Sequence, residues 1–240
     1  MKQVIQIVVI RKIKHSDSHS ILRAYSRQLG TVAFAVREGK TAEAGRRRAL
    51  SMPLTVLECV AVKRQGSELM SMSEPRAIFQ SIGIRMHPAK NAVALFMAET
   101  LGVVLHDSPP DVLLFDFLCR AVELLDTLPA HRVANFHICF LIHLAAMLGI
   151  APDFGDYTRG RVFDLIDGRF RSSAPLHSQF LSAADSAAAA LLGRITFANM
   201  HLYKYTRAQR NEVLDHILRY YEMHYTAMRT LKSPEVLRQC

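Results

Sequence analysis

Short stretches rich in β-branched residues fill the first third of the chain. The first, Val4 to Ile10, is almost continuously apolar, and four more follow over residues 19–27, 31–36, 54–62 and 68–73. Glycine, serine and charged residues fill the links, which leave no room for crossover helices. Five strands spaced so closely predict an antiparallel meander or a small closed barrel of the OB type.

Beyond Pro88 the apolar period changes from two residues to about 3.6 residues. Helices are predicted over residues 92–103, 110–127 and 130–148, and the third is apolar around almost its whole circumference, which is typical of a central helix. The expected fold class is therefore α+β, with an OB-fold barrel in residues 1–77 and an all-α helical domain in residues 78–240.

The helical domain carries three further signals. Residues 153–173 alternate around Asp167-Gly168, which predicts a small hairpin insertion. Ser182 opens an alanine-rich helix that ends at Gly193, and Thr206 with Gln209 is the capping-box signature of a long last helix.

Positive charge is concentrated in the predicted barrel. The chain has a formal net charge of +9, and residues 1–76 hold 14 Lys and Arg against 6 Asp and Glu, whereas the remaining residues hold 16 against 15. Clustered cations of this kind favour a polyanionic partner, because they neutralise phosphates and release counterions. An anionic membrane surface is the competing explanation.

Several classes of protein are disfavoured. The longest apolar run, Phe136 to Ile150, is too short to span a bilayer and contains two histidines. The run Val4 to Ile10 is short and lacks the cleavage site of a signal peptide, so it is interpreted as a strand and a cytoplasmic protein is expected. The four cysteines are far apart and form no C-x-x-C pair, which argues against disulfides and against a thiolate zinc site. No metal and no cofactor are expected.

Histidines and carboxylates supply no recognisable catalytic pattern. His15 with His19, His137 with His143, and His216 with His224 lack the spacing or the accompanying carboxylates of a metal site, and no phosphate-binding or nucleophile motif is present. A protein without enzymatic activity is expected. A histidine-dependent metallohydrolase is the least supported alternative.

The basic residues are the best candidates for a binding site. In small OB-type barrels, strands two and three and the flanking loops bind single strands, with cations on the phosphates and aromatic rings on the bases. The segment 37–48 is expected to be a basic loop, and Phe34 is either a second stacking ring or a core residue. The DNA-binding candidates are Arg11, Lys12, Lys14, Arg23, Tyr25, Arg27, Arg37, Lys40, Arg46, Arg47, Arg48, Lys63 and Arg64.

Three short motifs, in order along nearly the whole chain, resemble the RecO family of bacterial recombination mediators. The last residues match a closing Y-Y-x-x-H and L-K-S-x-x-L pattern, and a central segment is similar to an L-G-x-x-P junction. The matching stretches are Ile7 to Arg11, Asp17-Ser18, Tyr25 to Val32, Leu148 to Phe154, Tyr220 to His224 and Leu231 to Leu237.

The resemblance implies binding of single-stranded and double-stranded DNA, annealing of complementary strands, and contact with the C-terminal tail of the single-stranded-DNA-binding protein SSB. It also implies cooperation with RecR in loading RecA during repair. Many members carry a four-cysteine zinc module after the junction, but residues 153–173 have no cysteine here. Zinc is therefore not expected.

A second departure leaves the SSB-tail pocket unplaced. Members often have arginine before the phenylalanine of the helix that enters the junction, and here Ile138-Cys139 precedes Phe140. Arg120 and Arg132 are the remaining candidates for clamping a terminal carboxylate. The alternative function is an RNA-binding OB-fold protein that acts on tRNA or ribosomes.

Overall fold

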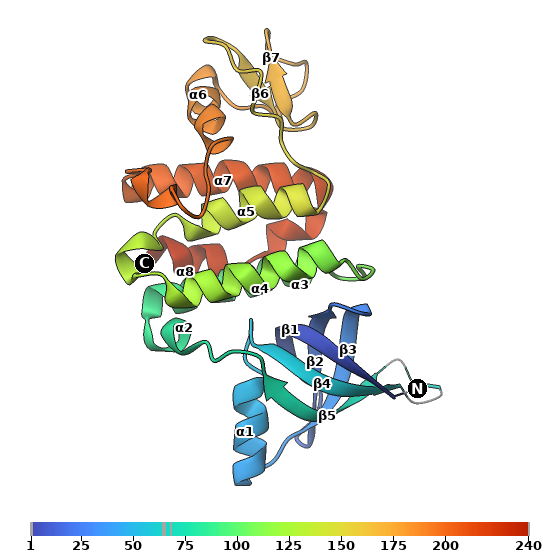
Figure 1. Ribbon diagram of the computed structural model, residues 1–240. Coiled ribbons are helices and arrows are strands. Elements are labelled where there is room, and N and C mark those ends of the chain that lie inside the picture. Colours follow the sequence, from blue (N-terminus) through green and yellow to red (C-terminus); the bar gives the residue numbers. More distant parts are fainter. Residues whose placement is uncertain (1, 64–65, 68, 240) are drawn as a thin grey trace. The chain divides into compact units, whose positions relative to one another are not determined.

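The computed structural model describes residues 2–63, 66–67 and 69–239, and it forms two compact units, Met1–Thr127 and Leu128–Cys240 (Figure 1). The first unit contains a five-stranded sheet and four helices, and the second contains the remaining helices and a small hairpin. The expected α+β class is confirmed.

The five strands of the first unit close on themselves. Their bounds are β1 (Lys2–Lys14), β2 (His19–Ser26), β3 (Gly30–Arg37), β4 (Val56–Lys63) and β5 (Met70–Ala77). They follow the order β1-β2-β3-β5-β4, and β4 pairs with β1 to complete a barrel. Every neighbouring pair is antiparallel except β3 and β5, which run parallel and pair at only two positions, Phe34 with Met70 and Ala35 with Ser71.

Alternation along the strands fills the barrel with apolar side chains. Ile5, Ile7 and Val9 of β1 point inward, and Leu22 and Ala24 of β2 do the same. Phe34 of β3 is fully buried among them, so the idea that its ring stacks on a base is wrong and the core role is confirmed.

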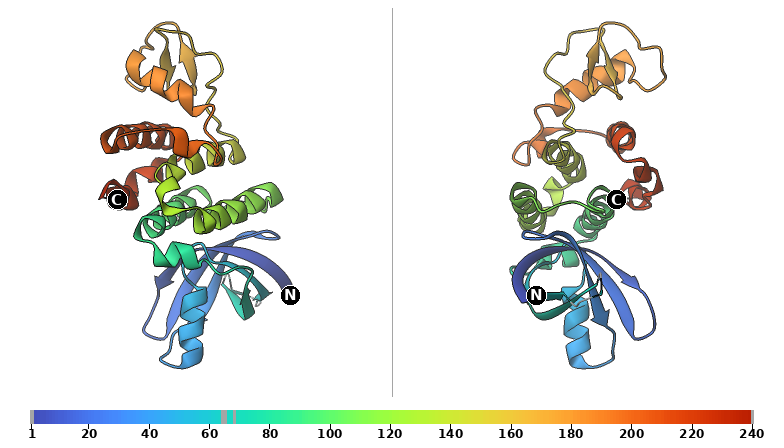
Figure 2. Two further views of the ribbon diagram at one scale, coloured as in Figure 1. Left: turned by 60° about the vertical axis from the view of Figure 1, so that its left-hand side comes forward. Right: turned by 90° about the vertical axis from the view of Figure 1, so that its right-hand side faces the viewer.

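The segment predicted as a loop between the third and fourth strands contains a helix, α1 (Ala42–Leu50). Thr41 caps it, because its side-chain oxygen accepts a hydrogen bond from the Ala44 N–H at 3.2 Å. Glu43 and Arg47, four residues apart, form an ion pair at 3.2 Å on its surface. Of the expected basic loop, residues 42–48 belong to this helix and residues 37–41 lie outside it. Helix α1 lies on the side of the barrel away from α3 and α4 (Figure 2).

Three helices complete the first unit, namely α2 (Ile82–Met86), α3 (Pro88–Val104) and α4 (Val112–Thr127). Pro88 occupies the first turn of α3, where its missing N–H costs nothing. Asp126 joins the three helices, because its carboxylate accepts from the Ile84 N–H at 2.8 Å and its carbonyl accepts from the Lys90 ammonium at 2.6 Å. Two of these helices, α3 and α4, contact β1.

The second unit is built around α5 (Phe136–Met147), which is buried on most of its circumference, as its apolar pattern predicted. The helix begins later than residue 130, after a short turn, η1 (Ala130–Arg132). The break precedes Asn135, whose amide donates to the carbonyls of Met200 at 2.9 Å and Tyr203 at 2.8 Å. A tertiary hydrogen bond thus replaces the expected first turn of the helix.

The hairpin and both capped helices are present as expected, but the helix that Thr206 opens is not the last one. The hairpin pairs β6 (Val162–Asp164) with β7 (Arg169–Arg171), and Gly168 adopts a positive φ of 66° in its turn. Ser182 caps α6 (Ala183–Leu192), and both hydrogen bonds of the Thr206 capping box are present at α7 (Arg207–His224). Three elements were not predicted: η2 (Met200–Leu202), η3 (Thr226–Thr230) and α8 (Ser233–Gln239).

No helix among the described residues has both the length and the apolar character needed to cross a membrane.

Candidate nucleic-acid interface

The cations expected in the link after the first strand lie instead on the strand itself, because β1 continues to Lys14. Arg11 and Lys14 are exposed, and Lys14 pairs with Asp17 at 2.7 Å. Lys12 pairs with Glu38 beside β3, and hydrogen bonds from Lys12 and then from Ser20 lower the pKa of Glu38. The Lys14 side chain is 71% exposed and that of Lys12 is 21% exposed, so Arg11 and Lys14 are better placed than Lys12 to meet a phosphate.

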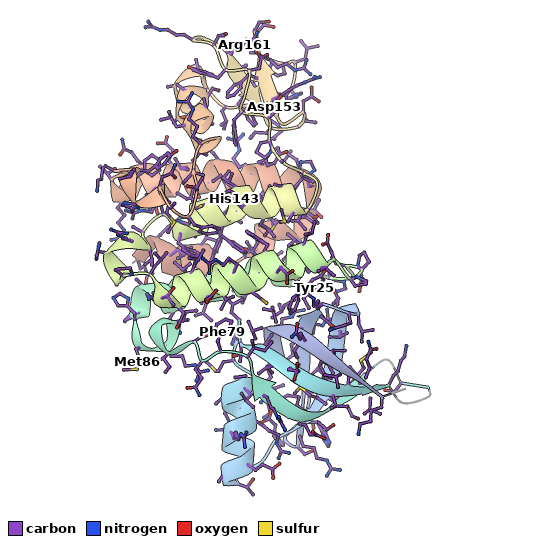
Figure 3. The ribbon with its side chains drawn as sticks, viewed as in Figure 1. Tyr25, Phe79, Met86, His143, Asp153 and Arg161 are labelled. Atoms are coloured by element: carbon purple, nitrogen blue, oxygen red, sulfur yellow. The ribbon has the colours of Figure 1, made fainter. Side chains whose placement is uncertain are left out.

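The second strand differs from its expected role. Arg23 is half-buried, and Tyr25 lies fully buried on the side of the barrel that faces α3 and α4 (Figure 3). The expectation that Tyr25 offers an exposed ring for base stacking is wrong, because the segment before α4 covers it. Its hydroxyl donates to the Pro109 carbonyl at 2.9 Å and accepts from the Asp111 N–H at 3.0 Å.

Arg27 is also engaged within the first unit. Its guanidinium makes a bidentate ion pair with the carboxylate of Asp116 on α4 and lies 5.8 Å from the centre of the Phe115 ring. A guanidinium held in this way on both sides is not available to a strand of DNA without breaking that pair. The outer face of β2 at this end is thus used for packing.

The three consecutive arginines are spread around α1, because successive residues of a helix are separated by about 100°. Arg46 is exposed, Arg47 pairs with Glu43, and Arg48 donates to the Gly39 carbonyl at 3.3 Å. A single clamp made by all three side chains is therefore not what this geometry offers. The helix instead presents its cations in different directions.

The remaining basic candidates lie near the strand ends. Arg37 at the end of β3, Lys40 just beyond it and Lys63 at the end of β4 are exposed. Arg64 lies outside the described residues.

One arginine that the sequence analysis missed belongs with this group. Arg76 on β5 is exposed and lies opposite Glu58 of β4. Its place depends on a β-bulge: from Val60 to Glu58 on β4 the partner residues on β5 advance from Ser73 to Arg76, one residue more than a regular ladder allows. Within the bulge, Glu74 adopts a positive φ of 53°.

The two candidates for a carboxylate clamp lie in different units. Arg120 is exposed on α4 and pairs with Glu123 at 2.9 Å. Arg132 is exposed on η1 and forms no ion pair with another described residue. Of the two, Arg132 has the freer guanidinium.

The two histidines of α5 are engaged inside the second unit. His137 is fully buried in α5, and burial, followed by the nearby Arg210, lowers its pKa to about 3. His143, also on α5, places its Nε2 3.1 Å from the Ile195 carbonyl oxygen (Figure 3).

One group among the described residues brings together donors that a metal ion could use, namely Asp185, Glu212 and His216, with ligand atoms within 4.8 Å of one another. Asp185 is already engaged at the start of α6, where its carboxylate accepts from the Ser182 hydroxyl at 2.7 Å. His216 lies 3.9 Å from the same carboxylate oxygen. The cap of α6 and a long contact between His216 and Asp185 account for the proximity of these two residues.

The thiols behave as small apolar groups. Cys59 and Cys139 are buried and Cys119 is half-buried, and burial raises the pKa of Cys59 to about 11 and those of Cys119 and Cys139 to about 12. Thiols so disfavoured as thiolates are poor nucleophiles and poor metal ligands. Cys240 lies outside the described residues.

Comparisons with known proteins agree with the motifs at both ends of the chain. The family model described as "Recombination protein O N terminal" matches residues 1–79, and the model described as "Recombination protein O C terminal" matches residues 85–234. The two matches together span both compact units.

Individual relatives are similar along nearly their entire length. The protein called DNA repair protein RecO in Porphyromonas gingivalis is 34% identical over 238 residues, which cover 98% of this chain and 97% of that protein. Proteins of the same name in Bacteroides fragilis and Christiangramia forsetii are 30% and 28% identical, over 97% of this chain and 96% of each relative. The OB-like barrel, the helical unit and these full-length matches show that the chain belongs to the RecO family.

Proposed function

We propose that this protein is a recombination mediator that binds single-stranded and double-stranded DNA and anneals complementary strands. Membership of the RecO family supports a role in DNA repair and recombination. The observation that carries the DNA-binding part is the excess of positive charge, 14 Lys and Arg against 6 Asp and Glu in residues 1–76, much of it exposed on β1, β3, α1 and β5.

The proposed role is not enzymatic. Annealing requires only that two strands be held with their phosphates neutralised, so that base pairing can proceed between them. Cations spread over several elements of the barrel suit this task, because sequence-independent electrostatic contacts allow a strand to shift its register. The barrel in residues 1–77 is the proposed DNA-binding domain.

Two protein partners complete the proposal. The C-terminal tail of SSB is expected to bind through its terminal carboxylate, with Arg132 favoured over Arg120 because Arg120 already has a carboxylate partner. RecR is the expected partner for loading RecA, and this contact rests on the family alone.

An annealing assay tests the proposal directly. Complementary strands coated with SSB are mixed with the protein, and SSB lacking its tail serves as the control. We expect faster annealing only with intact SSB. Tail-independent annealing would leave DNA binding without the mediator role, and no binding to DNA of any kind would remove the whole proposal.

The alternative of an RNA-binding protein is separated by affinity. Single strands of DNA and RNA with matched sequence and length are titrated under one salt condition, because affinities for nucleic acid depend strongly on salt. A clear preference for RNA would favour a role on tRNA or ribosomes.

A further inference from the structure

A groove runs between α1 and the β3–β5 side of the barrel. It has a volume of about 830 Å³ and is lined by the end of β3, by residues 71–76 of β5, by one side of α1 and by the exposed His19 of β2. It forms where β3 and β5 stop pairing, because their parallel ladder includes only Phe34 with Met70 and Ala35 with Ser71. In Figure 1 the helix α1 lies beside the end of β5.

The groove has an apolar floor. Val36, Leu50, Met72 and Pro75 line it, and Leu50 and Met72 also pack against the barrel core. Methionine is polarisable and adaptable, so Met72 offers a surface on which a flat ring can rest. An apolar floor offers no hydrogen-bond donor to a bare phosphate, but it can pack against a base or a deoxyribose.

Four arginines surround this floor: Arg37, Arg46, Arg47 and Arg76. Glu43 and Glu74 also line the groove, and Glu43 is paired with Arg47. Arg37, Arg46 and Arg76 are exposed and form no ion pair with another described residue, although Glu58 lies opposite Arg76 on β4. The groove therefore keeps three free guanidinium groups against the single free carboxylate of Glu74.

The bulge in β5 places Arg76 on this surface. Met72 is partly buried, because it packs against the barrel core while part of its side chain lines the groove, and its neighbour Ser73 is exposed. In a regular strand Arg76 would therefore lie on the core side with Met72. The extra residue in the bulge reverses this alternation and turns Arg76 to the outer face. Bulges are frequent beside functional sites, where they redirect a side chain, and Glu74 in the left-handed region shows the local backbone cost.

The usual nucleic-acid face of an OB barrel is unavailable at its centre. Tyr25 of β2 is buried against the segment before α4, and Arg27 is paired with Asp116. A strand that crossed this face would have to displace both contacts. The α1–β5 groove demands no such rearrangement.

We propose that the α1–β5 groove is the path of single-stranded DNA across the barrel, with phosphates on Arg37, Arg46 and Arg76 and unstacked bases on the floor formed by Met72, Leu50 and Pro75. A duplex keeps its base faces stacked inside and cannot use this floor, so the groove selects single strands. The proposal rests on the DNA-binding function above and specifies where that binding occurs.

A groove variant carrying Arg37→Ala, Arg46→Ala and Arg76→Ala tests the path. The matched control removes three other exposed arginines, through Arg85→Ala, Arg159→Ala and Arg194→Ala, so that both proteins lose the same charge. Binding of an oligo-dT strand is followed by fluorescence anisotropy at several salt concentrations. We expect the log–log salt slope to fall by up to ~0.7 per lost phosphate contact, about 2 in total, in the groove variant and to stay near the wild-type slope in the control.

A second strand tests the floor. An abasic oligomer of equal length keeps the phosphates and removes the bases. The wild-type protein is expected to prefer oligo-dT over the abasic strand, and the groove variant is expected to lose most of that preference, because its strand no longer enters the groove. Circular dichroism and thermal unfolding confirm that the variants are folded.

The outcomes separate the two proposals. If the wild-type protein fails to bind either strand, the DNA-binding function itself is wrong. If it binds oligo-dT and the groove variant behaves like the charge-matched control, the function stands and the groove is not the path. Equal wild-type affinity for oligo-dT and for the abasic strand would also overturn the assignment of the floor.

Discussion

The hydroxyl of Tyr25 on β2 donates a hydrogen bond at 2.9 Å to the backbone carbonyl of Pro109, which lies 84 residues further along the chain. The same oxygen accepts the Asp111 N–H at 3.0 Å. The Tyr25 hydroxyl thus holds the segment that leads into α4 against the outside of the barrel. Burial is the largest cause of a raised pKa for Tyr25. This side chain holds the first unit together, which is why it cannot stack on a base.

Replacing Tyr25 with phenylalanine should therefore lower stability and leave DNA binding largely intact. The change leaves the Pro109 carbonyl and the Asp111 N–H without a partner, at a cost of about 1–3 kcal/mol in the free energy of unfolding. Urea denaturation measures it, with Tyr157→Phe as the control, because no hydrogen bond of the Tyr157 hydroxyl is present among the described residues. A large loss of oligo-dT affinity in folded Tyr25→Phe protein would restore the stacking role.

Removing Arg46, Arg47 and Arg48 together should weaken single-strand binding at any sequence. The log–log salt slope should fall by less than the loss of three phosphate contacts would cause, because Arg47 is paired with Glu43 and Arg48 with the Gly39 carbonyl. If Arg46 alone makes a phosphate contact, the salt slope should fall by ~0.7. Anisotropy titrations on single variants provide the check, and an effect of Arg48→Ala larger than that of Arg46→Ala would contradict this ranking.

His137 should make stability depend on pH. Its pKa of about 3 in the folded protein lies below the usual value near 6.5, so between these values the unfolded chain binds a proton that the folded protein refuses. Stability therefore falls as pH drops through that window, by about 2 kcal/mol between pH 7.5 and 5.

Urea unfolding at pH 7.5 and pH 5 measures this effect. His137→Asn should lose roughly that much less stability on acidification than the wild-type protein does. The exposed His131 provides the control, and His131→Asn should retain the wild-type behaviour. Identical pH dependence in all three proteins would show that His137 is protonated without penalty.

The capping box at the start of α7 should contribute measurably to the second unit. Thr206→Ala removes the acceptor for the Gln209 N–H, now 3.2 Å away, and is expected to cost about 1 kcal/mol. Thr206→Ser keeps an oxygen at the same place and should cost far less. Urea denaturation distinguishes the two, and equal losses would mean that the hydrogen bond does not account for the effect.

Arg132 should contribute more than Arg120 to binding of the SSB tail. A labelled peptide with the acidic SSB C-terminus is titrated against Arg132→Ala and Arg120→Ala. The first variant is expected to lose at least several-fold in affinity, because hydrogen bonds to charged groups contribute about 1.5–3 kcal/mol. The reverse order would move the candidate pocket to α4.

The sequence was most informative where one element determines its own structure. Alternation located the five strands, and the caps at Ser182 and Thr206 located two helices, because those signals lie within a few residues of each other. Helix α1 was missed because Gly39 and Gly45 suggested a loop, although Thr41 as a cap and the Glu43–Arg47 spacing were signs of a helix.

The candidate site was harder to predict because it depends on distant segments. Alternation placed Tyr25 and Arg27 on the outer side of β2, but nothing near them shows that Pro109 and Asp116 cover that side. Arg76 was missed for a related reason. A bulge is a mismatch between two strands, and the sequence of β5 alone does not state how many residues face β4.

The bulge in β5 also means that chain length, as much as side-chain chemistry, decides where the charge of Arg76 lies. Deleting Glu74 would leave every arginine in place and still return β5 to regular alternation, which would drive Arg76 toward the apolar interior beside Met72. The loss of one residue here would therefore remove a positive charge from the edge of the α1–β5 groove and place a guanidinium among apolar side chains.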